Sequence, residues 1–261
     1  MYNIYVSTFG KKVINVKYGI PIEVGAQNRT SFIYPIHDDT GDNISQENEY
    51  YGELTGLYWV WKNVKIEDTD IIGFCHYNKA LNISSKKIKN WIAKNKFNGI
   101  ITARPTAIRN HPVPDEVQCV MQLLKEKNNS DFDAWNKLYD NEAAAKGKYC
   151  RGGNMFITSG KLFKEYCNWL FPLLNEMRHR IGDKPEVRPY MRRYCAFMGE
   201  RLLAVYIESN KLPTLDVSIK LKKWWIPILG KIRRCLFISN RNWAYRFLDR
   251  KLGNKSQYGN R

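Results

Sequence analysis

Asp70-Ile71-Ile72-Gly73-Phe74-Cys75-His76-Tyr77-Asn78 is the stretch of this 261-residue chain that most directly indicates its fold. Residues 70–75 contain a continuous apolar run of strand length, which is typical of a strand covered on both faces of a parallel sheet. His76-Tyr77-Asn78 follows where such a strand would end. The stretch therefore predicts a buried central strand that brings polar side chains to one edge of a sheet.

Further apolar runs alternate with segments of helical periodicity along the chain. Residues 2–8, 99–103 and 152–158 are predicted as strands. Leu54, Leu57, Tyr58 and Trp61 have the i, i+3, i+4, i+7 spacing of one buried helical face, with Ser45 or Asp42 as a candidate N-cap. Other helices are predicted at residues 86–96, 115–126, 131–145, 161–180 and 190–210. This alternation predicts an α/β domain, with a mostly parallel sheet flanked by helices.

Polar side chains follow three of the predicted strands. Ser7 and Thr8 end the first, His76-Tyr77-Asn78 follows the central strand, and Arg104 follows residues 99–103. Because ligands of open α/β sheets bind at the carboxyl ends of the strands, we expect these residues to form a ligand site.

The net charge and the positions of the cysteines limit the classes of protein to which the chain can belong. The net charge is +17, and residues 217–261 hold twelve Lys and Arg residues against one acid, Asp249. This segment therefore contributes +11 and the rest of the chain only +6. A basic tail suits anionic lipid or nucleic acid. The six cysteines include no C-x-x-C pair and the four histidines are far apart, so neither a zinc site nor a disulfide framework is predicted.

The C-terminal tail, residues 216–261, has the pattern of a basic amphipathic helix, interrupted at Pro227 and Gly230. One helical face carries its apolar residues, which are Leu221, Trp224, Trp225, Ile228, Leu229, Ile232 and Leu236. This pattern is typical of an anchor at an anionic membrane surface; packing of the face on the domain itself is the alternative. A nucleic-acid-binding protein is a second alternative, although the sequence has no helix-turn-helix, zinc-finger or RNA-binding motif.

The sequence shows no targeting or membrane-spanning segment. Its N-terminus reads directly as a strand, and no uncharged apolar run approaches the roughly 20 residues that span a bilayer. We therefore expect a domain of residues 1–215 that is peripheral to the cytoplasmic face of the inner membrane, held there by the tail.

Several segments together resemble a known family. They are residues 39–45 (DTGDNIS), 53–63 (ELTGLYWVWKN), 72–77 (IGFCHY), 154–157 (NMFI) and 199–203 (GERLL). Over residues 1–212 the chain is similar to the bacterial capsular and exopolysaccharide glycosyltransferase family first catalogued as a domain of unknown function. The resemblance implies a GT-A-like nucleotide-binding fold. It also implies transfer of a sugar, with galactose or galactofuranose expected, from a UDP-sugar to a lipid-linked oligosaccharide in capsule, exopolysaccharide or O-antigen synthesis.

The resemblance and the strand-end positions together imply a set of donor-binding residues: Thr8, Asp39, Asp42, His76, Tyr77, Asn78 and Arg104. Two positions depart from the family pattern, since Asn78 stands where Arg is usual and Phe9-Gly10 replaces a His-Lys pair. A catalytically inactive, scaffold-like relative is therefore a further alternative.

Two different sets of residues are candidates for neutralising the donor diphosphate. Asp39 and Asp42 offer hard oxygen ligands for Mg²⁺ or Mn²⁺. If no metal is used, Arg104 or Lys79 would neutralise the departing diphosphate instead.

Glu200 is the candidate general base of an inverting transfer, because it resembles the acid of the Gly-Glu-Asp segments of many inverting GT-A enzymes. Asn154 is the candidate acceptor-binding residue. Each has a structural alternative: an ion pair with Arg192, Arg193 or Arg201 for Glu200, and a turn for Asn154. For Asp39 and Asp42 the structural alternative is a turn or a helix cap.

Overall fold

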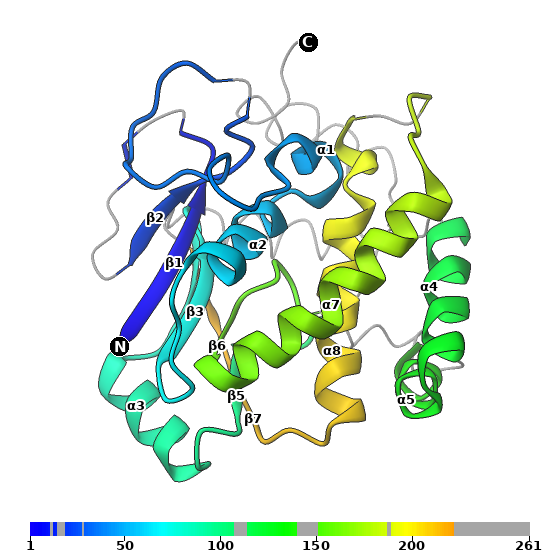
Figure 1. Ribbon diagram of the computed structural model, residues 1–261. Helices are drawn as coiled ribbons and strands as arrows, with labels where there is room; N and C mark the ends of the chain where they lie inside the picture. The colour runs from blue at the N-terminus through cyan, green and yellow to red at the C-terminus, as the bar shows by residue number, and fades with distance from the viewer. Residues whose placement is uncertain are drawn as a thin grey trace, which may run out of the picture. The chain divides into compact units, whose positions relative to one another are not determined.

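A mixed sheet forms the middle of the computed structural model, which describes residues 1–10, 13–14, 19–27, 29–106, 114–139, 151–186 and 189–221 (Figure 1). Residues 1–220 form one compact unit, and the second unit, residues 221–261, is described only at Leu221. The sheet order is β2-β1-β3-β6-β5-β7, and β4 pairs with both β3 and β8. The strands are β1 Tyr2–Thr8, β2 Ile20–Glu23, β3 Ile71–His76, β4 Lys79–Leu81, β5 Ile100–Ala103, β6 Phe156–Ser159, β7 Thr214–Val217 and β8 Ile219–Leu221.

The strand directions give the sheet one common edge. β1 is parallel to both β2 and β3, and β5 is parallel to β7. β6 is antiparallel to its two neighbours, β3 and β5. The sheet that was predicted as mostly parallel is therefore mixed: β1, β2, β3, β5 and β7 run one way and β6 runs against them.

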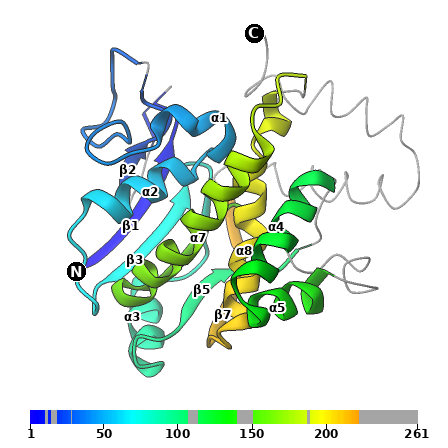
Figure 2. The same ribbon diagram turned by 45° about the vertical axis from the view of Figure 1, so that its right-hand side comes forward.

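Helices cover both faces of the sheet. The described helices are α1 Asn48–Tyr51, α2 Leu54–Asn63, α3 Ser85–Lys94, α4 Pro114–Lys127, α5 Asn129–Tyr139, α7 Gly160–Ile181 and α8 Tyr194–Ser209, with short 3₁₀ turns at Ser45–Glu47 and Pro189–Arg192. Figures 1 and 2 show α2, α7 and α8 against one face, with α4 and α5 beyond α7 and α8. α3 packs against the other face, where Ile88 and Ile92 join a separate hydrophobic cluster.

The central strand shows why its sequence is apolar at every position. Ile72 and Phe74 of β3 belong to the cluster under α2 and α7, whereas Ile71 and Cys75 belong to the cluster under α3. Alternate side chains of a strand point to opposite faces, so a strand covered on both sides has no solvent-facing position. The predicted buried central strand is therefore confirmed.

Two local predictions around the helices need correction. The 3₁₀ turn before α1 begins at Ser45, so its N-cap position is Ile44, which has no capping side chain; the Ser45 hydroxyl oxygen accepts from Gln27 N instead. Asp42 does not cap it either; its carboxylate contacts Tyr58 and Lys62 of α2. The strand predicted at residues 152–158 begins only at Phe156, because the preceding residues form a turn.

The sheet extends past the predicted domain boundary at residue 215. That boundary falls inside β7, and Leu221, which was assigned to the helical face of the tail, ends β8. The rest of the tail, residues 222–261, and residues 140–145 of a predicted helix lie outside the described residues. Among the described residues, no helix combines the length and apolarity needed to cross a membrane.

Candidate functional site

One edge of the sheet collects strand ends that are far apart in the sequence. β1, β2, β3, β5 and β7 all end there, and β6 begins there because it runs the opposite way. This carboxyl edge therefore carries Thr8, His76, Arg104 and the Gly153-Asn154 turn before β6. The sequence placed these residues at strand ends, and the topology brings the ends together.

The Gly153-Asn154 turn is the centre of the candidate site. Both residues have left-handed backbone conformations, with φ of +82° and +50°. Glycine adopts such values without steric cost, and asparagine tolerates them better than most residues. In this conformation the Gly153 N–H donates to Glu200 Oε1 at 2.5 Å, and the Gly153 carbonyl faces His76 Nε2. The turn thus holds Glu200 of α8 and His76 of β3 on two sides of one residue.

His76 lies half-buried beside this turn. Its side chain is 16% exposed, and its Nε2 is 3.8 Å from Glu53 Oε1. Burial lowers the pKa of His76 below its ordinary value, and the nearby Glu53 carboxylate does not reverse that shift. We therefore take the ring as neutral at neutral pH. Its Nε2, which faces the Gly153 carbonyl, then carries the hydrogen and donates.

Glu53 is a buried carboxylate that holds the Gly153-Asn154 turn through a hydrogen bond with Asn154. It occupies the N-cap position of α2, but its side chain makes no capping hydrogen bond. Arg193 Nη2 donates to Glu53 Oε2 at 2.7 Å, and Asn154 Nδ2 donates to Glu53 Oε1 at 2.8 Å. Burial raises the pKa of Glu53, whereas His76 in its protonated form, Arg193 and the Asn154 amide lower it, and the net shift is downward. Glu53 is therefore ionised at neutral pH.

The side chain of Asn154 points into the protein and not toward solvent. The residue is 2% exposed, and its Nδ2 also donates to the Ala196 carbonyl at 3.1 Å. Asn154 thereby joins β6 to Glu53 and to α8. This burial favours a positioning role for the residue that the sequence suggested as an acceptor ligand.

We expect Gly199→Ala to destabilise the protein by about 1–3 kcal/mol, the usual cost of overpacking. A Cβ at Gly199 would lie 2.7 Å from Asn154 Oδ1 and 2.9 Å from Leu54 Cδ1. Urea denaturation of the variant would measure this loss. Gly152→Ala is the matched control, because a Cβ there meets nothing within 4 Å and should leave stability nearly unchanged. Equal losses in the two variants would contradict the packing described for Asn154.

Glu200 reaches the carboxyl edge from the second turn of α8. Its side chain is partly exposed, and its backbone carbonyl accepts from Arg151 N at 3.3 Å. The arginines considered as its structural partners have ion-pair or hydrogen-bond partners of their own. Arg192 pairs with Glu49 at 2.7 Å, Arg193 pairs with Glu53, and Arg201 donates to the Phe197 carbonyl at 2.9 Å.

The remaining strand-end residues lie along the same edge of the sheet. Thr8 is buried, and its hydroxyl accepts from Gly10 N at 3.4 Å. Tyr77 and Asn78 form the tight connection between β3 and β4, with Tyr77 N donating to the Ser7 carbonyl at 3.0 Å. Arg104 is exposed after β5, two strands away from β3. The structure therefore brings His76, Asn154 and Glu200 together at the turn. Thr8 ends β1, the neighbour of β3, and Arg104 follows β5, the neighbour of β6.

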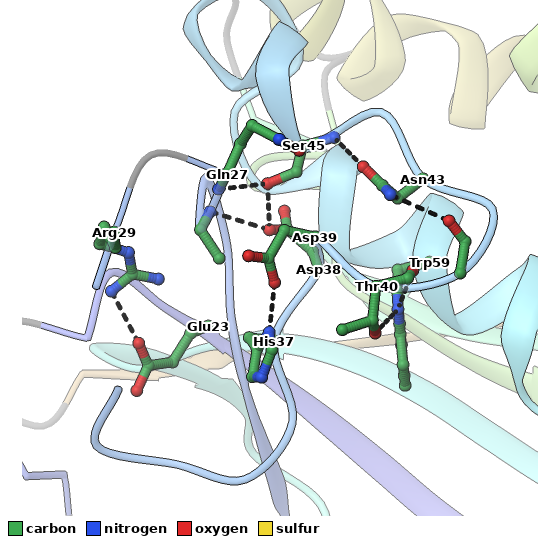
Figure 3. A network of polar contacts seen from close by, with 12 residues as sticks. Glu23, Gln27, Arg29, His37, Asp38, Asp39, Thr40, Asn43, Ser45 and Trp59 are labelled. Atoms are coloured by element: carbon green, nitrogen blue, oxygen red, sulfur yellow. Dashed lines mark hydrogen bonds and ion pairs between the residues drawn. The ribbon is translucent and has the colours of Figure 1, made fainter. Parts of the chain in front are cut away.

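Asp39 and Asp42 lie on a separate loop after β2, shown in Figure 3. Asp39 contacts the His37 ring, which Figure 3 shows next to the end of β2. Asp42 accepts from the Tyr58 hydroxyl at 3.0 Å and lies 3.8 Å from Lys62 Nζ. The loop itself is held by buried Asp38, which accepts from Gly25 N and Ala26 N.

The described residues do not fit a metal centre. The Asp39 and Asp42 carboxylates engage different partners, as above, and do not form one donor set. Within the described ranges there is no group of three or more His, Cys, Asp and Glu side chains that could hold a metal ion.

Sequence reasoning missed two buried ion pairs at this edge. One is Glu53–Arg193, and the other is Glu23–Arg29, in which Arg29 Nη1 lies 2.6 Å from Glu23 Oε2 (Figure 3). Glu23 ends β2 and also accepts from Ile33 N at 2.6 Å. The sequence offered a partial signal, because each acid directly adjoins apolar residues that turned out to be core.

Comparisons with known proteins agree with this architecture. Residues 3–211 match the family model described as a domain of unknown function, DUF4422. No curated protein sequence matches the chain significantly. Among solved structures, the apo structure of the bifunctional glycosyltransferase WbbM is similar, with a TM-score of 0.69 and 23% sequence identity over 84% of this chain. The chain spans only 45% of that structure's length, and the likeness at this identity establishes a shared fold.

Proposed function

The chain belongs to the DUF4422 family, and from this premise we propose that it is a glycosyltransferase, which moves a sugar from a nucleotide-sugar donor to a glycan acceptor. The fold shared with part of a bifunctional glycosyltransferase supports the proposal. The sequence resemblance to capsular and exopolysaccharide enzymes supports the same class of reaction.

The observation that carries the proposal is that Glu200 and His76 both contact the backbone of Gly153, Glu200 at its N–H and His76 at its carbonyl. Both side chains lie at the carboxyl edge, where ligands of α/β sheets bind. Glu200 is partly exposed, and the backbone N–H of Gly153 orients one of its carboxylate oxygens. The Glu53–Arg193 pair and Asn154 hold the turn that fixes this orientation.

In the proposed step Glu200 acts as the general base of an inverting transfer. The acceptor hydroxyl oxygen attacks the anomeric carbon while Glu200 takes the hydroxyl proton. The bond between the anomeric carbon and the diphosphate oxygen breaks, and its electron pair leaves with the nucleoside diphosphate. Inversion follows because the acceptor attacks from the face opposite the leaving group.

Cationic side chains at the edge would neutralise the departing diphosphate. Lys79 is paired in register with His76 across the β3–β4 turn, and Arg104 is exposed at the end of β5. Preorganised charges of this kind stabilise the negative charge that develops on a leaving group. His76, Tyr77 and Asn78 would add polar contacts, while Thr8, Asp39 and Asp42 would serve the nucleoside side of the donor.

The identity of the substrates belongs to the same proposal. We infer a UDP-sugar, with galactose or galactofuranose favoured by the resemblance, and a lipid-linked oligosaccharide acceptor at the inner leaflet. The basic tail would hold the enzyme at that surface, where its acceptor is confined.

A screen of nucleotide-sugars tests the proposal. Thermal unfolding of the full chain is measured with each donor, with and without Mn²⁺, and nucleotide release is then assayed with the best binder. We expect stabilisation by a UDP-sugar and not by the sugar or by ATP alone. A chain that no nucleotide-sugar stabilises would argue for the inactive, scaffold-like alternative.

A further inference from the structure

A cluster of exposed lysines covers the outer side of α3. We call it the α3 lysine surface, and it consists of Lys86, Lys87, Lys89, Lys94 and Lys96. Its neighbourhood in the sequence is free of acids, because no Asp or Glu occurs between Asp70 and Asp115. Within the described residues, none of the five lysines has a carboxylate within ion-pair distance.

Other basic residues of the same unit behave differently. Several lysines on the helix-rich side have carboxylate partners: Lys65 pairs with Glu67, Lys161 with Glu165 and Lys137 with Glu208. Arginines of the same region are paired as well, for example Arg180 with Glu126 at 2.9 Å. Among the described residues, five lysines without an ion-pair partner thus lie on or just after α3, on the opposite face of the sheet; Lys125 and Lys127 of α4, which also lack an ion-pair partner, lie over aromatic rings.

The surface also contains an aromatic side chain. Trp91 is half-buried: it packs against the cluster that contains Ile88 and Ile92, and it also lines a shallow hollow together with Ser84, Lys86, Lys87, Asn90 and Lys94. Lys87, Trp91 and Lys94 are spaced i, i+4, i+7, so they share one helical face, while Ile88 and Ile92 face the sheet. Tryptophan between lysines is a combination that suits the boundary between water and lipid headgroups.

We propose that the α3 lysine surface is a contact for an anionic lipid membrane, separate from the basic tail. A cluster of four to eight basic residues on an amphipathic helix is sufficient to bind anionic headgroups. The surface uses lysine alone, whose compact charge suits a fluid array of headgroups, whereas fixed nucleic-acid phosphates favour the planar fork of arginine. The charges thus fit a bilayer better than a nucleic acid.

This inference stands apart from the sugar-transfer chemistry. It rests on the proposed function only in that a lipid-linked acceptor would require the enzyme at a membrane. Vesicle binding is measured without donor or acceptor, so its outcome and the outcome of the donor screen are independent.

The test compares two triple variants of the full chain, which carry the same tail and the same loss of charge. The first is Lys86→Gln, Lys87→Gln, Lys94→Gln; the control is Lys65→Gln, Lys137→Gln, Lys161→Gln. Both sets are exposed. Partition onto vesicles of phosphatidylglycerol and phosphatidylcholine is measured by sedimentation. Because each lysine near an anionic surface contributes roughly a fivefold factor, we expect the α3 variant to bind about 100-fold more weakly and the control to change little.

Several results would overturn the proposal. Equal losses in the two variants would mean that only net charge matters, and unchanged binding of the α3 variant would mean that the surface is not used. Failure of the unmodified chain to bind anionic vesicles would also overturn the proposal. Tighter binding to duplex DNA than to vesicles at equal phosphate, lost in the α3 variant, would assign the surface to nucleic acid.

Discussion

Glu200→Gln is expected to lower kcat for sugar transfer by about 10²–10⁴-fold, the usual contribution of a general base. Gln retains an oxygen that can accept from Gly153 N, so the turn should keep its geometry. It lacks the basic carboxylate that takes the acceptor proton. Donor affinity should therefore stay nearly constant, and steady-state kinetics together with a donor titration would separate the two effects.

Glu208→Gln provides the matched control for this substitution. Glu208 belongs to the same helix, α8, and pairs with Lys137 at the surface. It should retain unmodified turnover and stability. If Glu200→Gln also keeps full turnover, or loses donor binding and folding together, Glu200 has a structural role and the base lies elsewhere, with Asp38, Asp39 and Asp42 as the next candidates.

Glu53→Ala is expected to reduce the free energy of unfolding by about 3–5 kcal/mol, because it leaves the partners of a buried ion pair uncompensated. The Arg193 guanidinium would lose its carboxylate, and the Asn154 amide would lose one of its two acceptors. Urea denaturation at neutral pH, where Glu53 is ionised, measures the loss.

Glu49→Ala is the corresponding control. Glu49 pairs with the adjacent arginine, Arg192, but its side chain is 45% exposed. Exposed pairs contribute at most about 1 kcal/mol, so this variant should lose far less stability. A loss of similar size in the two variants would show that burial of the Glu53–Arg193 pair is not what holds the turn.

The strands and helices with a strong local pattern could be predicted from the sequence. β3 was recognisable because burial on both faces makes every position apolar, and α2 because Leu54 and Leu57 keep helical spacing. β2, β4, β7 and β8 were not predicted. Each is three or four residues long and lies at or near a sheet margin, so it carries little periodic signal. In β7 and β8 the alternation of Leu215, Val217, Ile219 and Leu221 was a usable signal, which the basic composition of the tail obscured.

The candidate site was predictable in part for the same reason. His76 and Arg104 follow apolar strands, so their edge position is encoded locally. Glu53 and Arg193 are 140 residues apart, and only the tertiary fold makes them partners. The direction of β6 could not be predicted from the sequence either. It matters because it places Gly153 between His76 and Glu200.

Hydrogen–deuterium exchange of the full chain, with and without a saturating UDP-sugar, tests most directly whether the carboxyl edge is the donor site. Backbone amides exchange more slowly where a ligand orders or covers them. The proposed site predicts slowed exchange in peptides that cover residues 76–79 and 151–154, with little change at α3 or α5. Donor binding that leaves both edge peptides unprotected, or that protects only segments remote from the edge, would contradict it.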